Sequence, residues 1–280
     1  MTDLAPADFE VAFLGPEGSF SHLVAKKRFP DLPLKPFRTV PEVFASLDQH
    51  EREIGIVPIE NSSGGMIVET VDGLIEHACT LFIQEELSLN VRLALLAKPG
   101  TEIRTIYSHF APLQHCEPYL KEHFPNAKRV PQPSTSGSAQ AAAREPGVAA
   151  IGQLAMAEIY GLEVVAYPIR EEVPNITQFF VVGHTRQEAA SAEKTSLVVA
   201  LKNQAGSLYS FLKPFAEAGV NLTRIESRPT VGQPNTYRFL VELHGTEKEE
   251  AVRAAFRGAQ EVSTQFHNVG SYPVLPRYES

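Results

Sequence analysis

Cysteine is scarce in this chain, which contains only Cys79 and Cys116 among its 280 residues. Two cysteines cannot build a disulfide framework or a cysteine-based zinc cluster. Low cysteine use is typical of proteins that work in the reducing cytoplasm. The segment from Met1 to Glu10 is acidic and has no apolar core, so we do not expect it to act as a signal peptide. The sequence therefore predicts a cytoplasmic protein.

Long apolar runs and an excess of positive charge are also missing. The longest apolar runs, such as Leu93–Ala97, are far too short to span a bilayer. The formal net charge of −8 argues against a nucleic acid or an anionic membrane surface as a partner. A small anionic ligand would have to be held by local dipoles and a few cations against this overall field. We therefore expect no nucleic-acid partner and no membrane partner.

Several short motifs that indicate catalysis or cofactor binding are absent as well. The chain has no P-loop pattern G-x-x-x-x-G-K-[ST] and no G-x-G-x-x-G fingerprint after the first expected strand. Its nine histidines form no H-E-x-x-H pattern, and no G-x-S-x-G elbow marks a serine hydrolase. His109 and His115, near Cys116, form a loose cluster that is more typical of surface and helix residues. The sequence predicts no metal site and no cofactor.

What the chain does contain is a repeated alternation of strand and helix patterns. Apolar runs at 11–14, 54–59, 105–108 and 148–151 predict strands, and the helical patterns that follow most of them predict helices. Repeated β and α elements favour an α/β fold with parallel sheets and helices on both faces. A chain of this length is sufficient for two ordinary domains.

Three polar loops, at 18–21, 61–65 and 134–137, each follow an expected strand and precede an expected helix. Free backbone N–H groups at the start of a helix, together with hydroxyl groups, can bind an anion. In an open parallel sheet such loops lie at the carboxyl ends of the strands, where ligands bind. The same residue types also simply cap helices, so the pattern leaves both interpretations open. A carboxylate site between two lobes is the functional hypothesis.

A polar stretch, Asn175–Gln178, leads directly into the apolar run Phe179–Val182. This mixture predicts a loop or strand end that enters a buried strand, and we expect it at the centre of any active site. Residues 184–194 are polar and lack aromatic side chains, which predicts a joint. The order β-α-β-β-α-β after the joint is the ferredoxin-like motif. We predict a two-lobed domain at 1–188, with its second lobe at about 90–170, and a small domain at 193–280.

Motifs spread along nearly the whole chain resemble those of the prephenate dehydratase family in its monofunctional bacterial form. The matching pieces, in the family's order, are Gly15–His22, Val57–Ser62, Tyr107–His109, Ser134–Thr135, Ala157–Leu162 and Asn175–Phe179. The tail resembles an ACT regulatory domain, because Gly206–Tyr209 and Glu226–Pro229 match the phenylalanine-site motifs of that family. The resemblance implies a two-lobed, periplasmic-binding-protein-like catalytic domain followed by a ferredoxin-like ACT domain.

The resemblance also implies a reaction and a set of site residues. Prephenate would lose its ring carboxylate as CO₂ and its hydroxyl as water, giving phenylpyruvate in phenylalanine biosynthesis without a cofactor. The family's essential threonine matches Thr177. A threonine hydroxyl is a poor acid near pH 7, so we interpret Thr177 as a hydrogen-bond donor to the leaving oxygen. The residues expected to bind the substrate are Ser19, Phe20, Ser21, Asn61, Ser62, Ser134, Thr135, Gln178 and Phe179.

One position departs from the family pattern, because Gln178 stands where arginine is usual. Arginine offers a fixed charge and a bidentate fork for a carboxylate, whereas glutamine offers one amide. Arg92, Arg104 and Arg170 are other cations that could hold a substrate carboxylate. An arogenate dehydratase is therefore one alternative. A cytoplasmic carboxylate-binding sensor without catalysis is another, because lobe closure around a ligand needs no chemistry.

The ACT resemblance implies feedback inhibition by L-phenylalanine, in a homodimer or homotetramer formed through this domain. Gly206 lies just before an expected helix, where a ligand site could use free N–H groups. We expect a chain cut after Lys194 to keep some activity and to lose its response to phenylalanine. The expected effector-binding residues are Gly206, Ser207, Leu208, Tyr209, Asn221, Leu222, Glu226, Ser227, Arg228 and Pro229.

Overall fold

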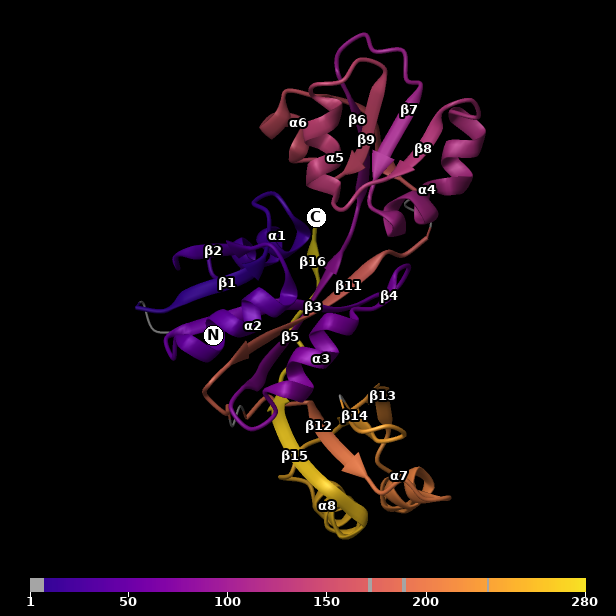
Figure 1. Cartoon of the computed structure of the whole chain (residues 1–280). Helices are drawn as coiled ribbons and strands as arrows, with labels where there is room; N and C mark the ends of the chain where they lie inside the picture. The colour runs from indigo at the N-terminus through magenta and orange to yellow at the C-terminus, as the bar shows by residue number, and fades with distance from the viewer. Residues whose placement is uncertain (1–7, 171–172, 188–189, 231) are drawn as a thin grey trace.

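Three sheets follow one another along an elongated molecule in the computed structural model, which describes residues 8–170, 173–187, 190–230 and 232–280 (Figure 1). A seven-stranded and a five-stranded sheet form the two lobes of the first domain, and a four-stranded sheet forms the C-terminal domain. The expected α/β architecture is confirmed. Among the described residues, no helix is both long enough and apolar enough to cross a membrane.

The first lobe contains a mixed sheet rather than the expected parallel one. Its strands are β1 (Glu10–Leu14), β2 (Leu34–Phe37), β3 (Glu53–Asn61), β4 (Gly65–Met66), β5 (Phe82–Asn90), β11 (Ile176–Gly183) and β16 (Tyr278–Glu279). Its helices are α1 (Phe20–Arg28), α2 (Val40–Gln49) and α3 (Val68–Glu76). The strand order is β16-β5-β11-β3-β1-β2, with β4 on β3. Strand β11 runs antiparallel to β3 and β5, because the chain returns through β11 from the second lobe.

The second lobe is inserted between β5 and β11 of the first. Its strands are β6 (Leu93–Ala97), β7 (Thr105–Ser108), β8 (Lys128–Pro131), β9 (Val148–Gly152) and β10 (Glu163–Ile169). Its helices are α4 (Phe110–His123), α5 (Thr135–Ala142) and α6 (Met156–Tyr160). The order is β10-β6-β9-β7-β8, and β6 runs antiparallel to both of its neighbours. This sheet is therefore also mixed, and two chain segments connect the lobes.

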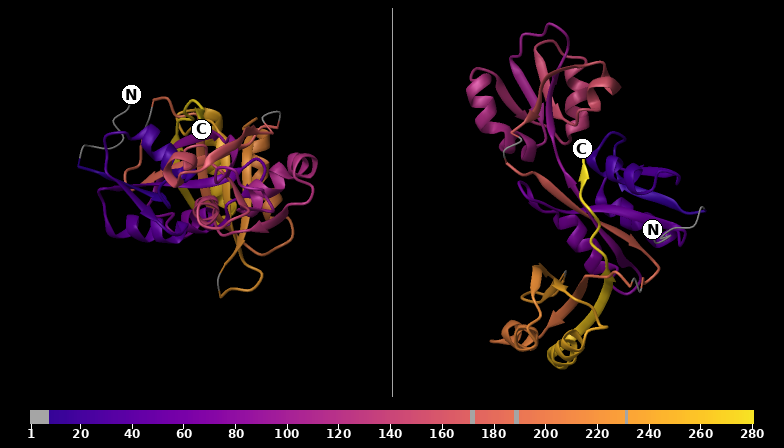
Figure 2. Two further views of the ribbon diagram at one scale, coloured as in Figure 1. Left: turned by 90° about the horizontal axis from the view of Figure 1, so that it is seen from above. Right: turned by 180° about the vertical axis from the view of Figure 1, so that it is seen from behind.

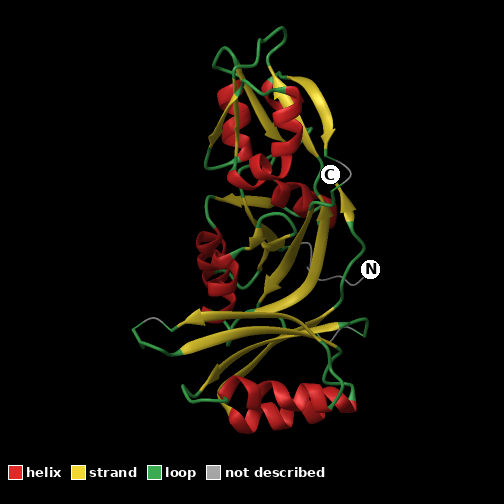
Figure 3. Ribbon diagram, turned by 90° about the vertical axis from the view of Figure 1, so that its right-hand side faces the viewer, coloured by secondary structure: helices red, strands yellow, loops and turns green. Residues whose placement is uncertain are grey.

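The C-terminal domain has the predicted β-α-β-β-α-β order. Its elements are β12 (Lys194–Leu201), α7 (Ser207–Glu217), β13 (Leu222–Pro229), β14 (Tyr237–His244), α8 (Glu250–Val262) and β15 (Ser263–Tyr272). The strands are antiparallel in the order β13-β14-β12-β15. Both helices cover one face of this sheet, and the other face is turned toward the first lobe (Figure 3).

The face turned toward the first lobe shares a hydrophobic core with it. Val198, Leu240 and Tyr272 of the C-terminal domain belong to the same buried cluster as Phe180 and Val182 of β11. After β15 the chain returns to the first lobe, where β16 pairs with β5 (Figure 2). The predicted small domain at 193–280 therefore includes a strand that belongs to the first sheet. The two domains are joined by apolar packing and by this strand, not only by residues 184–194.

Candidate active site

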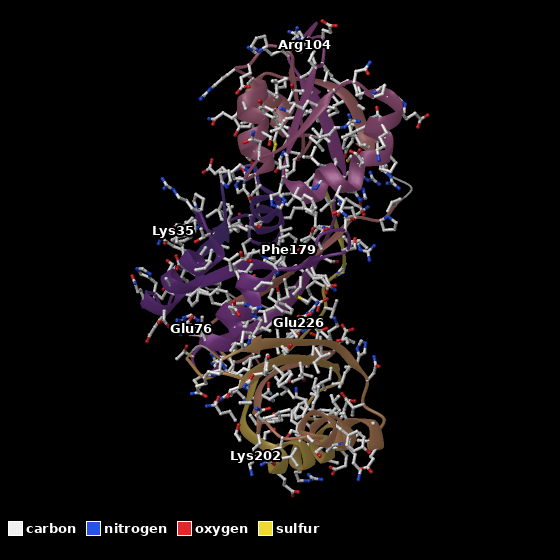
Figure 4. The ribbon with its side chains drawn as sticks, turned by 45° about the vertical axis from the view of Figure 1, so that its right-hand side comes forward. Lys35, Glu76, Arg104, Phe179, Lys202 and Glu226 are labelled. Atoms are coloured by element: carbon white, nitrogen blue, oxygen red, sulfur yellow. The ribbon has the colours of Figure 1, made fainter. Side chains whose placement is uncertain are left out.

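A cavity of about 780 Å³ lies between the two lobes of the first domain. The loops that follow β1, β2 and β3 line it from the first lobe, and the loops that precede α4 and α5 line it from the second. Figure 4 shows Phe179 in the first lobe, close to the boundary with the second. Of the residues predicted to bind substrate, those that line this cavity are Ser19, Phe20, Ser21, Asn61, Ser134, Thr135 and Phe179, together with the predicted catalytic residue Thr177.

The loop before α1 is fixed by local hydrogen bonds. Ser19 is the N-cap of α1, where its hydroxyl accepts from the backbone N–H of His22 and donates to the carbonyl of Leu14. Nδ1 of His22 accepts from the N–H of Gly18 at 2.9 Å, which requires a ring nitrogen without a proton. Burial is the main cause that lowers the pKa of His22, and nearby Glu17 opposes it. This loop therefore presents the first turn of α1, with its free N–H groups, to the cavity.

The loop before α5 presents a second helix start, from the other lobe. Ser134 is the N-cap of α5 and accepts from the N–H of Gly137 at 3.0 Å. Thr135 and Ser136 follow it and line the cavity. The hydroxyl oxygen of Ser136 is buried and has no hydrogen-bond partner among the described residues. A buried polar atom without a partner costs free energy, so Ser136 is available to a ligand. Sequence reasoning missed it, although it lies in the predicted loop.

The third loop does not open a helix as predicted. Residues after Asn61 turn into β4, which pairs back on β3, and α3 begins only at Val68 without a side-chain cap. Here the Asn61 side chain organises the turn, because its Oδ1 accepts from the N–H groups of Ser63 and Gly64 at 2.9 and 2.7 Å. Those two donors fix the orientation of the amide, since an oxygen must face them.

The amide nitrogen of Asn61 consequently faces strand β11. It donates to Oδ1 of Asn175 and to Oγ1 of Thr177, both at 2.8 Å. Asn61 and Thr177 are also register partners in the pairing of β3 with β11. Because Thr177 accepts this hydrogen bond, its own hydroxyl hydrogen remains available to another acceptor. Thr177 lines the cavity, so that acceptor can belong to a ligand.

Gln178 lies on the other face of β11 and does not line the cavity, although the sequence predicts it as a substrate-binding residue. Side chains of a strand alternate between the two faces of the sheet, and Thr177 and Phe179 occupy the cavity face. The Gln178 amide donates to Oε1 of Glu86 at 3.1 Å and accepts from Arg224 of the C-terminal domain at 2.7 Å. Gln178 therefore lies at the interface with the C-terminal domain and not in the cavity.

Ser62 also has a different position from the one predicted. Its hydroxyl accepts from the N–H of Ile176 at 2.9 Å and donates to the carbonyl of Pro174 at 3.2 Å. It does not line the cavity. Ser62 lies in the turn that follows β3, and its side chain is directed to the backbone just before and at the start of β11. It holds the start of β11 against the end of β3.

Arg38 is the one lysine or arginine among the described residues that line the cavity. The three candidates named from the sequence lie elsewhere. The guanidinium of Arg92 is near the Glu279 carboxylate, and that of Arg170 donates to the carbonyl of His115. Arg104 lies against Gly147. Arg38 follows β2, in a loop whose sequence carries no recognisable motif, so sequence reasoning missed it.

The predicted effector residues lie on the surface of the C-terminal domain. Gly206 is the N-cap of α7 with φ of 83°, and Tyr209 in the first turn is 70% exposed. Arg228, on β13, forms a two-point ion pair with Asp72 of α3 at 2.6 and 2.9 Å. The other residues named for this site are at the start of α7 (Ser207, Leu208) and on or just before β13 (Asn221, Leu222, Glu226, Ser227, Pro229).

Two family models match the chain along most of its length. The prephenate dehydratase model matches residues 11–187, and the ACT domain model matches residues 195–259. A curated relative is the bifunctional chorismate mutase/prephenate dehydratase of Stutzerimonas stutzeri. It is 33% identical over 265 residues, which cover 94% of this chain and 73% of the relative.

Solved structures share the fold over both domains. The prephenate dehydratase of Arthrobacter aurescens in complex with L-Phe is 32% identical with a TM-score of 0.85, and the match covers 94% of this chain and 89% of that one. A structure described as GqqA, a novel type of quorum quenching acylase, is 26% identical with a TM-score of 0.82. That match covers 95% of this chain and 98% of the other.

Proposed function

The chain belongs to the prephenate dehydratase family, and we propose that it converts prephenate into phenylpyruvate, as a carbon–oxygen lyase of phenylalanine biosynthesis. The observation that carries this proposal is the Asn61–Thr177 hydrogen bond at the wall of the inter-lobe cavity. The Thr177 hydroxyl hydrogen is available to a ligand in this cavity. The N-termini of α1 and α5, together with Arg38, make the cavity favourable for carboxylates. Prephenate carries two carboxylates and a hydroxyl that must leave.

Thr177 acts on the leaving hydroxyl in this proposal. When the bond between the ring and its carboxylate breaks, the electron pair moves into the ring and the carbon–oxygen bond of the hydroxyl breaks. CO₂ leaves, the ring becomes aromatic, and the departing oxygen takes up a proton as water. Thr177 donates to that oxygen while Asn61 donates to Thr177. A donor placed on developing charge contributes about 3–4 kcal/mol to stabilising a transition state.

The remaining cavity residues hold the substrate. The starts of α1 and α5 lie on opposite lobes, so each can take one carboxylate. Arg38 assists, as does the Ser136 hydroxyl, which has no partner within the part of the chain that the structure describes. The rings of Phe20 and Phe179 provide apolar surface for the ring of prephenate. Binding between two lobes also excludes water from the reacting centre.

The test is formation of phenylpyruvate, measured by its absorbance in alkali after incubation of the chain with prephenate. We expect turnover with prephenate and slower turnover with arogenate. A preference for arogenate would assign the chain to arogenate dehydration. Binding of prephenate without any product would instead identify a carboxylate sensor, and the proposed activity would be rejected.

We further propose that L-phenylalanine binds the C-terminal domain and inhibits the enzyme. The ACT match, and the L-Phe complex of the Arthrobacter relative, support this regulation. The exposed side chains at the start of α7, such as Tyr209, fit a site completed by a second copy in a homodimer or homotetramer. We place the enzyme in the cytoplasm with its substrate. Inhibition by L-phenylalanine and the mass in solution, measured by light scattering, test these points.

A further inference from the structure

Arg224 on β13 reaches out of the C-terminal domain and contacts two strands of the catalytic sheet. One of its terminal nitrogens donates to Oε2 of Glu60 at 3.0 Å and to Oε1 of Gln178 at 2.7 Å. The other donates to Oε2 of Glu242, within its own domain, at 2.7 Å. The arginine is only 8% exposed. Figure 4 shows Glu226, two residues along the same strand, at the boundary between the two domains.

The two residues that Arg224 binds in the catalytic sheet are directly opposite each other. Glu60 on β3 and Gln178 on β11 are register partners, and the next pair in the same register is Asn61 and Thr177. Adjacent Cα atoms are about 3.8 Å apart, and adjacent side chains point to opposite faces. Arg224 therefore binds the back of the sheet one residue from the pair that faces the substrate cavity.

The Gln178 side chain is held at both ends of its amide. Its nitrogen donates to Glu86 on β5, and the Glu86 carboxylate also accepts from Lys194 at 2.8 Å. Lys194 in turn bonds Glu242 at 3.1 Å, so the network closes on the carboxylate that anchors Arg224. A side chain with a donor and an acceptor both satisfied by buried charges has little freedom to change rotamer.

We propose that Arg224 is a positioning residue for the dehydratase reaction: it clamps Glu60 to Gln178 and so keeps Asn61 in hydrogen-bonding register with Thr177. The proposal rests on the function proposed above, in which Thr177 acts on the leaving hydroxyl. A guanidinium is suited to this role because its planar fork can serve three acceptors at fixed angles, which an ammonium cannot. The C-terminal domain therefore contributes to the geometry of an active site that it does not contact.

The test compares the variants Arg224→Lys and Gln178→Met with Arg238→Gln as control. Arg238, on the neighbouring strand β14, also reaches into the first lobe, but it donates to the carbonyl of Ile75 in α3 and not to β3 or β11. We expect kcat to fall about tenfold in the first two variants while KM for prephenate stays within about twofold. The control should keep the kcat of the original chain.

Two features of the design separate positioning from general stability. Gln178→Met leaves the buried Arg224–Glu242 pair intact, so it remains informative if Arg224→Lys folds poorly. The variant that combines Arg224→Lys with Gln178→Met should lose no more kcat than the more impaired single variant, because both substitutions disrupt the same clamp. Additive losses that follow the loss of melting temperature would overturn the proposal, as would an unchanged kcat in folded Gln178→Met.

A second measurement does not depend on turnover. The side-chain NH₂ resonances of Asn61, observed by NMR, report its hydrogen bond to Thr177. We expect them to shift in Arg224→Lys and Gln178→Met, and to stay in place in Arg238→Gln. If the original chain does not turn over prephenate but these resonances shift in the two variants, the proposed role of Arg224 is supported and only the proposed reaction is rejected. Unshifted resonances overturn the clamp, whether or not the enzyme is active.

Discussion

Asn61 donates a hydrogen bond to the Thr177 hydroxyl over 2.8 Å, and two backbone N–H groups fix the direction of that bond. A threonine that had to donate to asparagine would have no hydrogen left for a substrate. Here the backbone groups of Ser63 and Gly64 occupy the amide oxygen, so the amide nitrogen is the part that faces Thr177. Because Asn61 is the donor and Thr177 the acceptor in this hydrogen bond, Thr177 can act as a donor to the substrate, as proposed.

Thr177→Ala should lower kcat by a factor of about 10² or more and leave KM for prephenate nearly unchanged. The removed hydroxyl stabilises charge that appears only in the transition state. Thr177→Ser is the matched control, since it keeps the hydroxyl in place and should retain most of the activity. Steady-state kinetics with both variants check this. An alanine variant with full kcat would reduce Thr177 to a turn-forming residue.

Asn61→Asp should lower kcat and change its dependence on pH. The carboxylate can still accept from Ser63 and Gly64, so the turn is preserved, but its second oxygen can only accept. The Thr177 hydroxyl would then donate to this oxygen and have no hydrogen left for the substrate. Protonation of that oxygen restores a donor, so activity should rise as the pH is lowered toward the pKa of the new carboxyl group. A kcat profile from pH 5 to pH 8 tests the prediction. Asn126→Asp, in an exposed turn, is the control and should keep the original profile.

The part of the site that could be predicted from the sequence depends on local chemistry. Ser19 and Ser134 each cap a helix by accepting from an N–H group three residues further on, so both partners belong to one short stretch. Thr177 was found through its motif. Asn61 lies in a predicted loop, but the prediction that this loop opens a helix missed the pairing of β4 with β3.

The part that could not be predicted depends on contacts between distant segments. The register of β11 with β3 and β5 determines the face of the sheet on which Gln178 lies. No local sequence pattern specifies this register. Arg38 enters the cavity because β2 is at the edge of the sheet beside β1. Strand β16 is only two residues long and too short to show any period. Its pairing with β5 is visible only in three dimensions.

Arg38→Met should raise KM for prephenate by about tenfold with a smaller change in kcat. The guanidinium is the one cationic side chain of lysine or arginine type among the described cavity residues, so its loss removes attraction felt by both the bound substrate and the transition state. Methionine keeps much of the side-chain volume. Arg52→Met is the control, because Arg52 is in the same lobe but pairs with Asp8 at the surface. An unchanged KM would show that the helix starts alone hold the carboxylates.

Acidification should destabilise the chain through His22. Burial lowers the pKa of His22 from its ordinary value of 6.5, and its Nδ1 must stay unprotonated to accept from Gly18. As the pH falls below 6.5, the unfolded chain takes up a proton before the folded chain does, so the stability present above that pH is lost. The melting temperature between pH 7.5 and pH 5 should fall less steeply in His22→Gln. His244→Gln, at an exposed site, should follow the original slope.

A chain that ends at Lys194 should lose stability, contrary to the expectation from the sequence that it would remain active. Truncation there removes Val198, Leu240, Val269 and Tyr272 from the core that they share with the first lobe. Fully burying a large apolar side chain stabilises a fold by about 1.5–3 kcal/mol, so this loss is comparable with the total stability of a domain. Phe180, now buried in a T-shaped contact with the Tyr272 ring, would be exposed to water.

Two truncated chains separate the contribution of the shared core to stability from the contribution of the C-terminal segment. Their thermal unfolding and their activity are the measurements. A chain ending at Tyr272 keeps the core but lacks β16 and its pairing with β5. The missing segment also includes the backbone hydrogen bonds of Pro273 and Leu275 to Glu86 and the packing of Leu275 and Tyr278 on the first lobe. This chain should therefore melt below the full chain, but it should still unfold cooperatively and retain activity because the shared core is intact. The chain ending at Lys194 should aggregate or unfold without a cooperative transition. If it instead folds and converts prephenate, the catalytic domain is independent of the C-terminal domain, and the shared core has no role in holding it together.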